Sequence, residues 1–206
     1  MLGVLITLVV CIGAAGWGRV LLFRGNVALD PAAAWGVSAL LGLGGYGLLT
    51  LGIGLVPGGL PGWGIYVIGV ITLIGVAVLV GELGSPLLKA PKGTELLAPV
   101  VIAIAALFAL VSVLAPSDAS DWDTLAYHLA VPKLWIQAGR IEFIPSIHHS
   151  NFPFTIDLLY VWGLQWGGES GAKAFQLAYL LIGALLIVRG LALLYTTLFA
   201  RSHGHA

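Results

Sequence analysis

Long apolar runs separated by short polar connections make up most of this chain, and their lengths predict its fold class. A helix needs about 20 apolar residues to cross a membrane hydrocarbon core of about 30 Å. The runs that reach this length, the third only with its flanking glycines, are residues 2–23, 34–56, 65–80, 96–114 and 174–199. The pattern therefore predicts an all-α, polytopic helical membrane protein.

A sixth apolar stretch, residues 154–166, is shorter and carries Asp157. As a helix it would measure about 20 Å, which is less than the thickness of the hydrocarbon core. It is therefore either a span extended by interfacial residues or a re-entrant segment that leaves the membrane where it entered. We expect a span, which gives about six transmembrane helices followed by a polar tail at residues 201–206.

Composition supports a membrane protein and removes several functional classes. Apolar residues make up 59% of the chain and charged residues 9%, against about 25% charged residues in soluble domains. Mean hydropathy is +1.03. Nine basic residues balance nine acidic ones, so no charge excess points to nucleic acid. Cys11 is the only cysteine, which excludes an intrachain disulfide.

The first apolar run and the glycines each allow two explanations. Residues 1–16 resemble the apolar region of a signal peptide, but no Lys or Arg precedes them, so a first span is simpler. The chain has 29 glycines, many of them inside apolar runs. They could form a contact between two copies of the chain, but close packing of helices within one bundle is the more common use.

Basic residues in the connections predict orientation, because cytoplasmic loops carry an excess of Lys and Arg. With six spans, the side with more basic residues is expected to be cytoplasmic. The long segment 117–153 is then extracytoplasmic, and it stays so if residues 154–166 re-enter the membrane. The two groups are Arg19, Arg24, Lys89, Lys92 and Lys173 against Lys133, Arg140 and Arg201.

Segment 117–153 has the pattern of short helices that lie on the membrane surface. Pro132 suits the first turn of a helix and Gly139 suits a left-handed C-terminal residue. Before them comes an amphipathic helix, whose apolar face has the spacing i, i+3, i+4 and i+7 and consists of Trp122, Leu125, Ala126 and Leu129. Its polar side carries Asp121, Asp123, Thr124, Tyr127 and His128.

Three carboxylates, Asp118, Asp121 and Asp123, lie within six positions of this segment and allow two explanations. Ser120 and Asp123 have the spacing of a capping box, and acids are favourable near a helix N-terminus. The alternative is chemistry at the membrane surface, with Asp121 and Asp123 acting together. These two carboxylates and His148 could bind a divalent cation such as Mg or Mn, although a solvated loop is the simpler explanation for the histidine.

Residues 121–181 read "DWDTLAYHLAVPKLWIQAGRIEFIPSIHHSNFPFTIDLLYVWGLQWGGESGAKAFQLAYLL". This stretch resembles the first extracytoplasmic loop and the next two spans of GT-C-type membrane glycosyltransferases, among them protein O-mannosyltransferases and bacterial aminoarabinose lipid A transferases. The resemblance covers about residues 97–200, so residues 1–95 would be an N-terminal addition of three spans. The positions that match the family pattern are Asp123, Tyr127, Gly139, Pro145, Pro153, Tyr160, Trp162 and Gly167 or Gly168.

The resemblance implies transfer of a sugar from a polyprenyl-phosphate-linked or polyprenyl-diphosphate-linked donor to an acceptor outside the membrane. Asp123, together with Asp121, would be the catalytic carboxylate that takes a proton from the acceptor or orients it, and in some members the loop acid binds a metal. The leaving lipid phosphate needs a cation, for which Lys133 and Arg140 are local candidates. Further substrate contacts are expected from Tyr127, His128, Asn151 and Asp157.

The chain departs from the family pattern in three ways. Thr124 stands where the family has a second acid, unless Asp121 takes that role, and Asn151 stands where the family has a lysine. Family members also have about twice as many spans, and their lipid-phosphate site draws on the later ones. We therefore expect a truncated enzyme, or one piece of an enzyme whose partner chain supplies further transmembrane helices.

Two other functional classes fit the pattern. A non-catalytic accessory subunit of a membrane complex would keep the fold and lack the chemistry. Half of a transporter is less consistent, since the chain has no internal repeat. Within the membrane, Asp157 and Arg189 are expected to pair or to reach the interface, with Asp157 joining the carboxylates of the loop as the alternative.

Overall fold

The computed structural model describes residues 1–25, 29–82, 97–151 and 155–199, and every regular element in these ranges is a helix. The predicted all-α fold is confirmed. In chain order the elements are α1 (Leu2–Arg24), α2 (Pro31–Gly54), α3 (Trp63–Glu82), α4 (Leu97–Leu114), the π-helix η2 (Thr124–His128), α5 (Ala130–Ala138), the 3-10 helix η3 (His148–Asn151) and α6 (Asp157–Phe199).

Five helices, α1, α2, α3, α4 and α6, are long and apolar enough to cross a membrane. The first four expected spans each coincide with one of them. The chain therefore has the helices of a multi-pass membrane protein, as its composition predicts. Several residues used in the sequence predictions lie outside the described residues, namely Lys89, Lys92, Pro153 and the tail 201–206.

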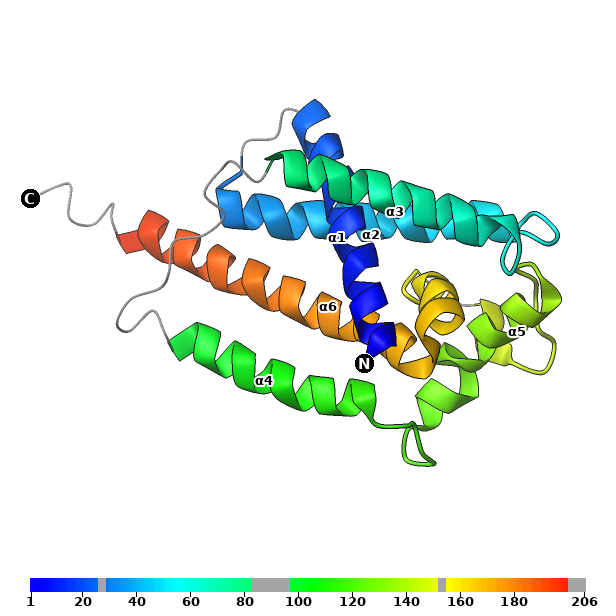
Figure 1. Cartoon of the computed structure of the whole chain (residues 1–206). Helices are drawn as coiled ribbons and strands as arrows, with labels where there is room; N and C mark the ends of the chain where they lie inside the picture. The colour runs from blue at the N-terminus through cyan, green and yellow to red at the C-terminus, as the bar shows by residue number, and fades with distance from the viewer. Residues whose placement is uncertain (26–28, 83–96, 152–154, 200–206) are drawn as a thin grey trace, which may run out of the picture.

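Helix α1 crosses the bundle and packs against α2, α3 and α6, as Figure 1 shows. A methyl group on Gly42 of α2 would collide with the backbone of Ala14, and one on Gly18 with the backbone of Ser38. Glycine lets two helix backbones approach this closely. These glycines therefore pack helices within one chain. By contrast, α4 lies at the edge of the bundle and packs against α6 (Figure 1).

Helix α6 breaks sharply at Gly168, where φ is 63° and ψ is −155°. The chain folds back there, so that a methyl group on Gly163 would lie 2.6 Å from the backbone of Ala172. In one straight helix these two residues would be about 13 Å apart along the axis. Residues 157–167 thus form a short helix of about 16 Å that lies along the start of the long piece, residues 169–199.

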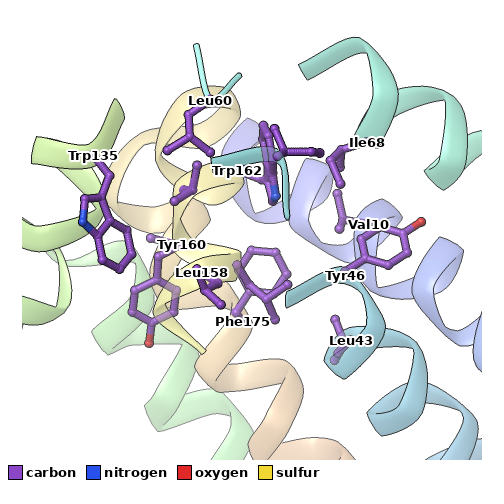
Figure 2. Packing of buried hydrophobic residues seen from close by; sticks show 14 of the residues in the cluster. Val10, Leu43, Tyr46, Leu60, Ile68, Trp135, Leu158, Tyr160, Trp162 and Phe175 are labelled. Atoms are coloured by element: carbon purple, nitrogen blue, oxygen red, sulfur yellow. The ribbon is translucent and has the colours of Figure 1, made fainter. Parts of the chain in front are cut away.

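The short piece of α6 forms the centre of the hydrophobic core. Tyr160 and Trp162 are buried, with Tyr160 on the side of Trp135 and Trp162 on the side of Ile68 (Figure 2). The Trp162 indole N–H donates to Thr50 Oγ1 at 2.6 Å. Since a buried polar group without a partner is costly, this bond lets an indole occupy the core. The stretch expected as a sixth span is therefore enclosed by other helices.

One end of the bundle gathers the long loop, one terminus each of α1, α2 and α4, and the break in α6. Gly3, near the start of α1, packs against Gly167 at the α6 break. Ile141 N donates to Gly54 O at the end of α2, at 2.7 Å. Ser117, just after α4, donates its backbone N–H to Glu169 Oε1 at 2.6 Å. We call this region the loop end of the bundle.

Candidate functional site

A buried carboxylate and a histidine join the loop to the start of α6. His128 Nδ1 lies 2.8 Å from Asp157 Oδ1. Asp157 is only 4% exposed, whereas 34% of the His128 side chain is exposed. Asp157 occupies the first turn of α6, and His128 is the last residue of η2. Both residues were expected among the substrate contacts, and the structure brings them together.

His128 reaches Asp157 from a π-helical turn. The backbone N–H of Leu129 donates to Thr124 O at 2.9 Å, which is a bond across five residues. The sequence predicted an ordinary amphipathic helix here, whereas in the structure the backbone hydrogen bond spans five residues instead of four. Single π-turns of this kind occur frequently at functional sites. Leu125 and Leu129, both on the predicted apolar face, line a cleft between α5 and α6.

An aromatic stack lies beside the histidine. The rings of Tyr127 and His149 are stacked, with centroids 4.3 Å apart and planes at 13°. Tyr127 also contacts the ring of His128, at 4.2 Å between centroids. Trp122 meets Tyr127 and His149 edge-on, at 6.4 Å from each. The stack fastens η3 to η2, whereas the sequence offered His149, like His148, only as a metal ligand or as part of a solvated loop.

Asp123 lies beside this stack and accepts a hydrogen bond from the Tyr127 hydroxyl. Burial raises the pKa of Tyr127 above its usual value, and the charge and hydrogen bonding of Asp123 add to that rise. A phenol with a raised pKa stays protonated and remains a donor. Asp123, Tyr127, His128 and Asp157 therefore form one connected polar group, which we call the loop cluster.

The other two aspartates of the loop, Asp118 and Asp121, have a local role. Asp118 accepts hydrogen bonds from the hydroxyl and the backbone N–H of Ser120, at 2.6 and 2.7 Å, and these bonds lower the pKa of its carboxyl. The Ser120 hydroxyl thus donates to Asp118, and among the described residues no side-chain hydrogen bond of a capping box joins Ser120 to Asp123. Asp121 accepts from Leu125 N through its backbone carbonyl, at the start of the helical segment. Its side chain is exposed.

A cleft of about 520 Å³ opens between α5, η2 and the α6 break. Lys133 lies at its wall, opposite Glu169 and Gln165 of α6. Within the part of the chain that the structure describes, Gln165 Nε2 is buried and has no hydrogen-bond partner. The remaining walls are apolar apart from Gln137, and they consist of Leu125, Leu129, Ala130, Ile136, Leu164 and Gly168.

Glu169 also takes part in a buried contact that holds α4 in place. Lys173, only 6% exposed, donates to Glu169 Oε1 at 3.1 Å and to Ala115 O at 2.7 Å. Glu169 accepts the backbone N–H of Ser117 as well. With six spans, the orientation argument placed Lys173 on the side opposite the loop, whereas a re-entrant segment 154–166 would move it to the loop side. The structure places it at the loop end, because the chain folds back at Gly168.

Other predicted site residues lie apart from the loop cluster. Arg140 forms an exposed ion pair with Glu142, at 2.7 Å. Asn151 is the last residue of η3, and the position of its side chain is not part of the described structure. His148 touches His149 edge-on at 5.0 Å. Gly139 adopts the predicted left-handed conformation at the end of α5, with φ at 74°.

The expected pairing of Asp157 with Arg189 is wrong. Arg189 binds Asp30 instead, with Nη2 and Nε at 2.8 and 3.2 Å from Asp30 Oδ1. The reason is distance, since about 30 Å of helix separates the α6 break from Arg189. Asp30 precedes α2 and accepts the N–H of Ala32 at 3.1 Å, which makes it the N-cap of that helix.

The predicted metal ligands Asp121, Asp123 and His148 do not assemble into a site. Among the described residues, no group of three His, Cys, Asp or Glu side chains is arranged to hold a metal ion. A requirement for Mg or Mn stays a prediction. Comparison of the chain with protein-family models, curated proteins and solved structures found no match. Any function must therefore be argued from the residues of the loop end.

Proposed function

We propose that this chain is a membrane glycosyltransferase that takes a sugar from a polyprenyl-phosphate-linked donor and transfers it to a hydroxyl acceptor on the extracytoplasmic side. The observation that carries the proposal is the loop cluster, in which Asp123, Tyr127, His128 and Asp157 meet beside the membrane-length helices. The cluster offers carboxylate and imidazole groups where a lipid-linked substrate and a water-side acceptor could meet. The sequence resemblance to GT-C-type enzymes points to the same chemistry.

The cleft between α5 and α6 supports binding of a lipid phosphate. Its apolar walls suit the first isoprenoid units of a carrier, and Lys133 supplies a cation for the phosphate. The unpartnered Gln165 Nε2 can donate a hydrogen bond to the same anion. A cation and a donor at this place stabilise the negative charge that grows on the leaving phosphate.

Asp123 is proposed to orient the acceptor. Its carboxylate is exposed, so an acceptor hydroxyl can donate to it from the water side. The Tyr127 hydroxyl donates to this carboxylate, and the Tyr127 ring stacks on His149. A fixed carboxylate reduces the entropy that must be lost when the acceptor binds.

We further infer five spans, with residues 157–167 as a re-entrant helix. The loop end then lies on one side, and the connections between α1 and α2 and between α3 and α4 lie on the other. Basic residues are more numerous on that other side, which favours an extracytoplasmic loop end. They are Arg19, Arg24, Lys89, Lys92, Arg189 and Arg201, against Lys133, Arg140 and Lys173 at the loop end.

The test is a transfer assay with membranes that contain the full chain, a polyprenyl-phosphate-linked sugar and hydroxyl acceptors. Asp123→Asn keeps the size of the side chain and removes its charge, and we expect transfer to fall by at least about 10²-fold. Asp118→Asn is the matched control, because the described hydrogen bonds of Asp118 lie within its own turn, to Ser120 and Asp121. Unchanged transfer by Asp123→Asn would contradict the role of Asp123.

The same assay separates the proposal from a non-catalytic accessory subunit. An accessory subunit would copurify with a larger membrane partner, and Asp123→Asn would leave the transfer rate of that complex unchanged. A transferase gives the opposite pattern, in which this one carboxylate controls the rate while membrane insertion is unchanged.

A further inference from the structure

The distance between His128 and Asp157 does not by itself show which of the two donates the hydrogen bond. A carboxylate accepts hydrogen bonds and, when ionised, donates none. With an ionised Asp157 whose Oδ1 lies 2.8 Å away, a neutral His128 ring carries its proton on Nδ1. The second ring nitrogen, Nε2, then carries a lone pair.

That second nitrogen is free to act. In the described part of the chain, His128 Nε2 has no hydrogen-bond partner, and a third of the side chain is exposed. The ring itself is held from two sides, by Asp157 at Nδ1 and by the ring of Tyr127 at 4.2 Å. A ring that is fixed in place with an available lone pair has the arrangement of a general base.

Burial of the Asp157 carboxylate gives the contact with His128 an energetic reason, because a buried carboxylate needs a hydrogen-bond partner. Asp157 is 4% exposed, and Arg189, the cation expected to neutralise it, is bound to Asp30. His128 is the group that meets the buried charge. If the imidazole gains a proton, the adjacent carboxylate stabilises the resulting cation. The charged and titratable groups around His128 are Asp157 from α6, Asp123 and Tyr127 from the η2 segment, and His149 from η3 through Tyr127.

We infer that His128 is the catalytic base of the proposed transferase and that Asp157 is its positioning residue, an inference that rests on the function proposed above. The acceptor oxygen forms a bond to the anomeric carbon while its proton passes to Nε2 of His128. The bond between the anomeric carbon and the phosphate oxygen breaks, and the lipid phosphate leaves with the electron pair. Asp123 orients the acceptor hydroxyl, and Asp157 keeps the proton of the resting ring on Nδ1.

The tautomer can be measured without any activity. We would label the full chain with ¹⁵N-histidine, place it in detergent micelles and identify His128 by the signal that His128→Gln removes. We expect the neutral ring to be protonated at Nδ1 and unprotonated at Nε2. In Asp157→Asn, whose amide can donate to Nδ1, we expect the opposite tautomer or a mixture. An Nε2–H tautomer in the unsubstituted chain would overturn the assignment.

Catalysis is tested in the transfer assay with the same variants. We expect His128→Gln to lower kcat by on the order of 10²- to 10⁴-fold with little change in KM for the donor, because a base acts in the transition state. Added imidazole should restore part of the rate to His128→Ala but none to Asp123→Asn. Asp157→Asn should lower kcat together with the change of tautomer, and Asp118→Asn should do neither.

Failure of this inference and failure of the proposed function look different. If the unsubstituted chain transfers sugar and Asp123→Asn does not, but His128→Gln keeps the full rate, His128 is not the base and the transferase proposal stands. If the unsubstituted chain transfers no sugar from any polyprenyl-phosphate donor, the proposed function falls and the catalytic role of His128 falls with it.

Discussion

Trp162 and Thr50 lie 112 positions apart in the sequence, and the indole N–H of the first donates to the hydroxyl of the second at 2.6 Å. Thr50 in turn donates to the backbone carbonyl of Tyr46 at 2.7 Å. Both side chains are fully buried. This bond joins the short piece of α6 to α2, so it holds the segment that carries Asp157 in position.

Thr50→Val keeps the shape of the side chain and leaves the indole N–H of Trp162 without its acceptor. We expect the free energy of unfolding in detergent micelles to fall by about 1 to 2 kcal/mol, the usual cost of such a loss inside a membrane protein. Near-UV circular dichroism during thermal unfolding measures it. Thr197→Val, at an exposed site near the end of α6, is the control and should change little.

Gly168→Ala tests the break in α6. The φ of 63° combined with ψ of −155° suits glycine, and a residue with a Cβ there costs about 1 to 3 kcal/mol. This cost comes from the backbone conformation and not from a steric clash, since a methyl group on Gly168 would meet nothing within 4 Å. The expected result is a lower unfolding temperature and weaker donor binding, because Gly168 also lines the cleft.

Gly183→Ala provides the comparison for that variant. Gly183 lies in the long piece of α6, and a methyl group there would also meet nothing within 4 Å. Since its conformation is helical, alanine should leave stability unchanged or raise it by up to about 1 kcal/mol. Equal effects of the two substitutions would contradict a backbone role for Gly168.

The ion pair between Asp30 and Arg189 should make stability depend on pH. Desolvation raises the pKa of Asp30, but the hydrogen bond from Arg189 and those from the N–H groups of Ala33 and Ala32 outweigh it, so the pKa is lowered overall. A lowered pKa in the folded state contributes stability above the usual aspartate pKa, and that stability is lost as pH falls through the folded value.

Arg189→Met removes the cation from this pair. We expect it to lower the unfolding temperature at neutral pH, and we expect the difference from the unsubstituted protein to disappear only once the pH has fallen below the lowered folded-state pKa of Asp30. Unfolding measured in micelles as the pH is lowered from neutral would show it. A difference that stays constant over the whole range would mean that Arg189 stabilises α6 by packing alone.

Lys133 tests the cleft as the site of the lipid phosphate. Lys133→Gln should raise KM for a polyprenyl-phosphate-linked sugar by roughly 10-fold, which corresponds to about 1.4 kcal/mol of lost binding. Lys133→Arg keeps the charge and should recover most of the affinity. The measurement is transfer rate against donor concentration. Lower kcat with unchanged KM for Lys133→Gln would instead place this lysine at the reacting bond.

The sequence by itself determined the helices. Each span follows from a local run of apolar residues, and Gly139 was identified as a left-handed helix end because glycine adopts that conformation at little cost. The concentration of carboxylates and histidines between α4 and α6 is also a local property. These features depend on neighbours in the chain, and reading the chain is enough to find them.

Only the tertiary structure decided which charges meet. Asp157 and Arg189 formed the obvious pair inside the membrane, yet the chain folds back at Gly168 and carries Arg189 toward Asp30. The same fold brings Lys173 to Ser117, and it places Asp157 next to His128. Periodicity shows where a helix lies but not which helix ends become neighbours. A charge strongly favours whichever opposite charge is close, so its partner is set when the helices pack.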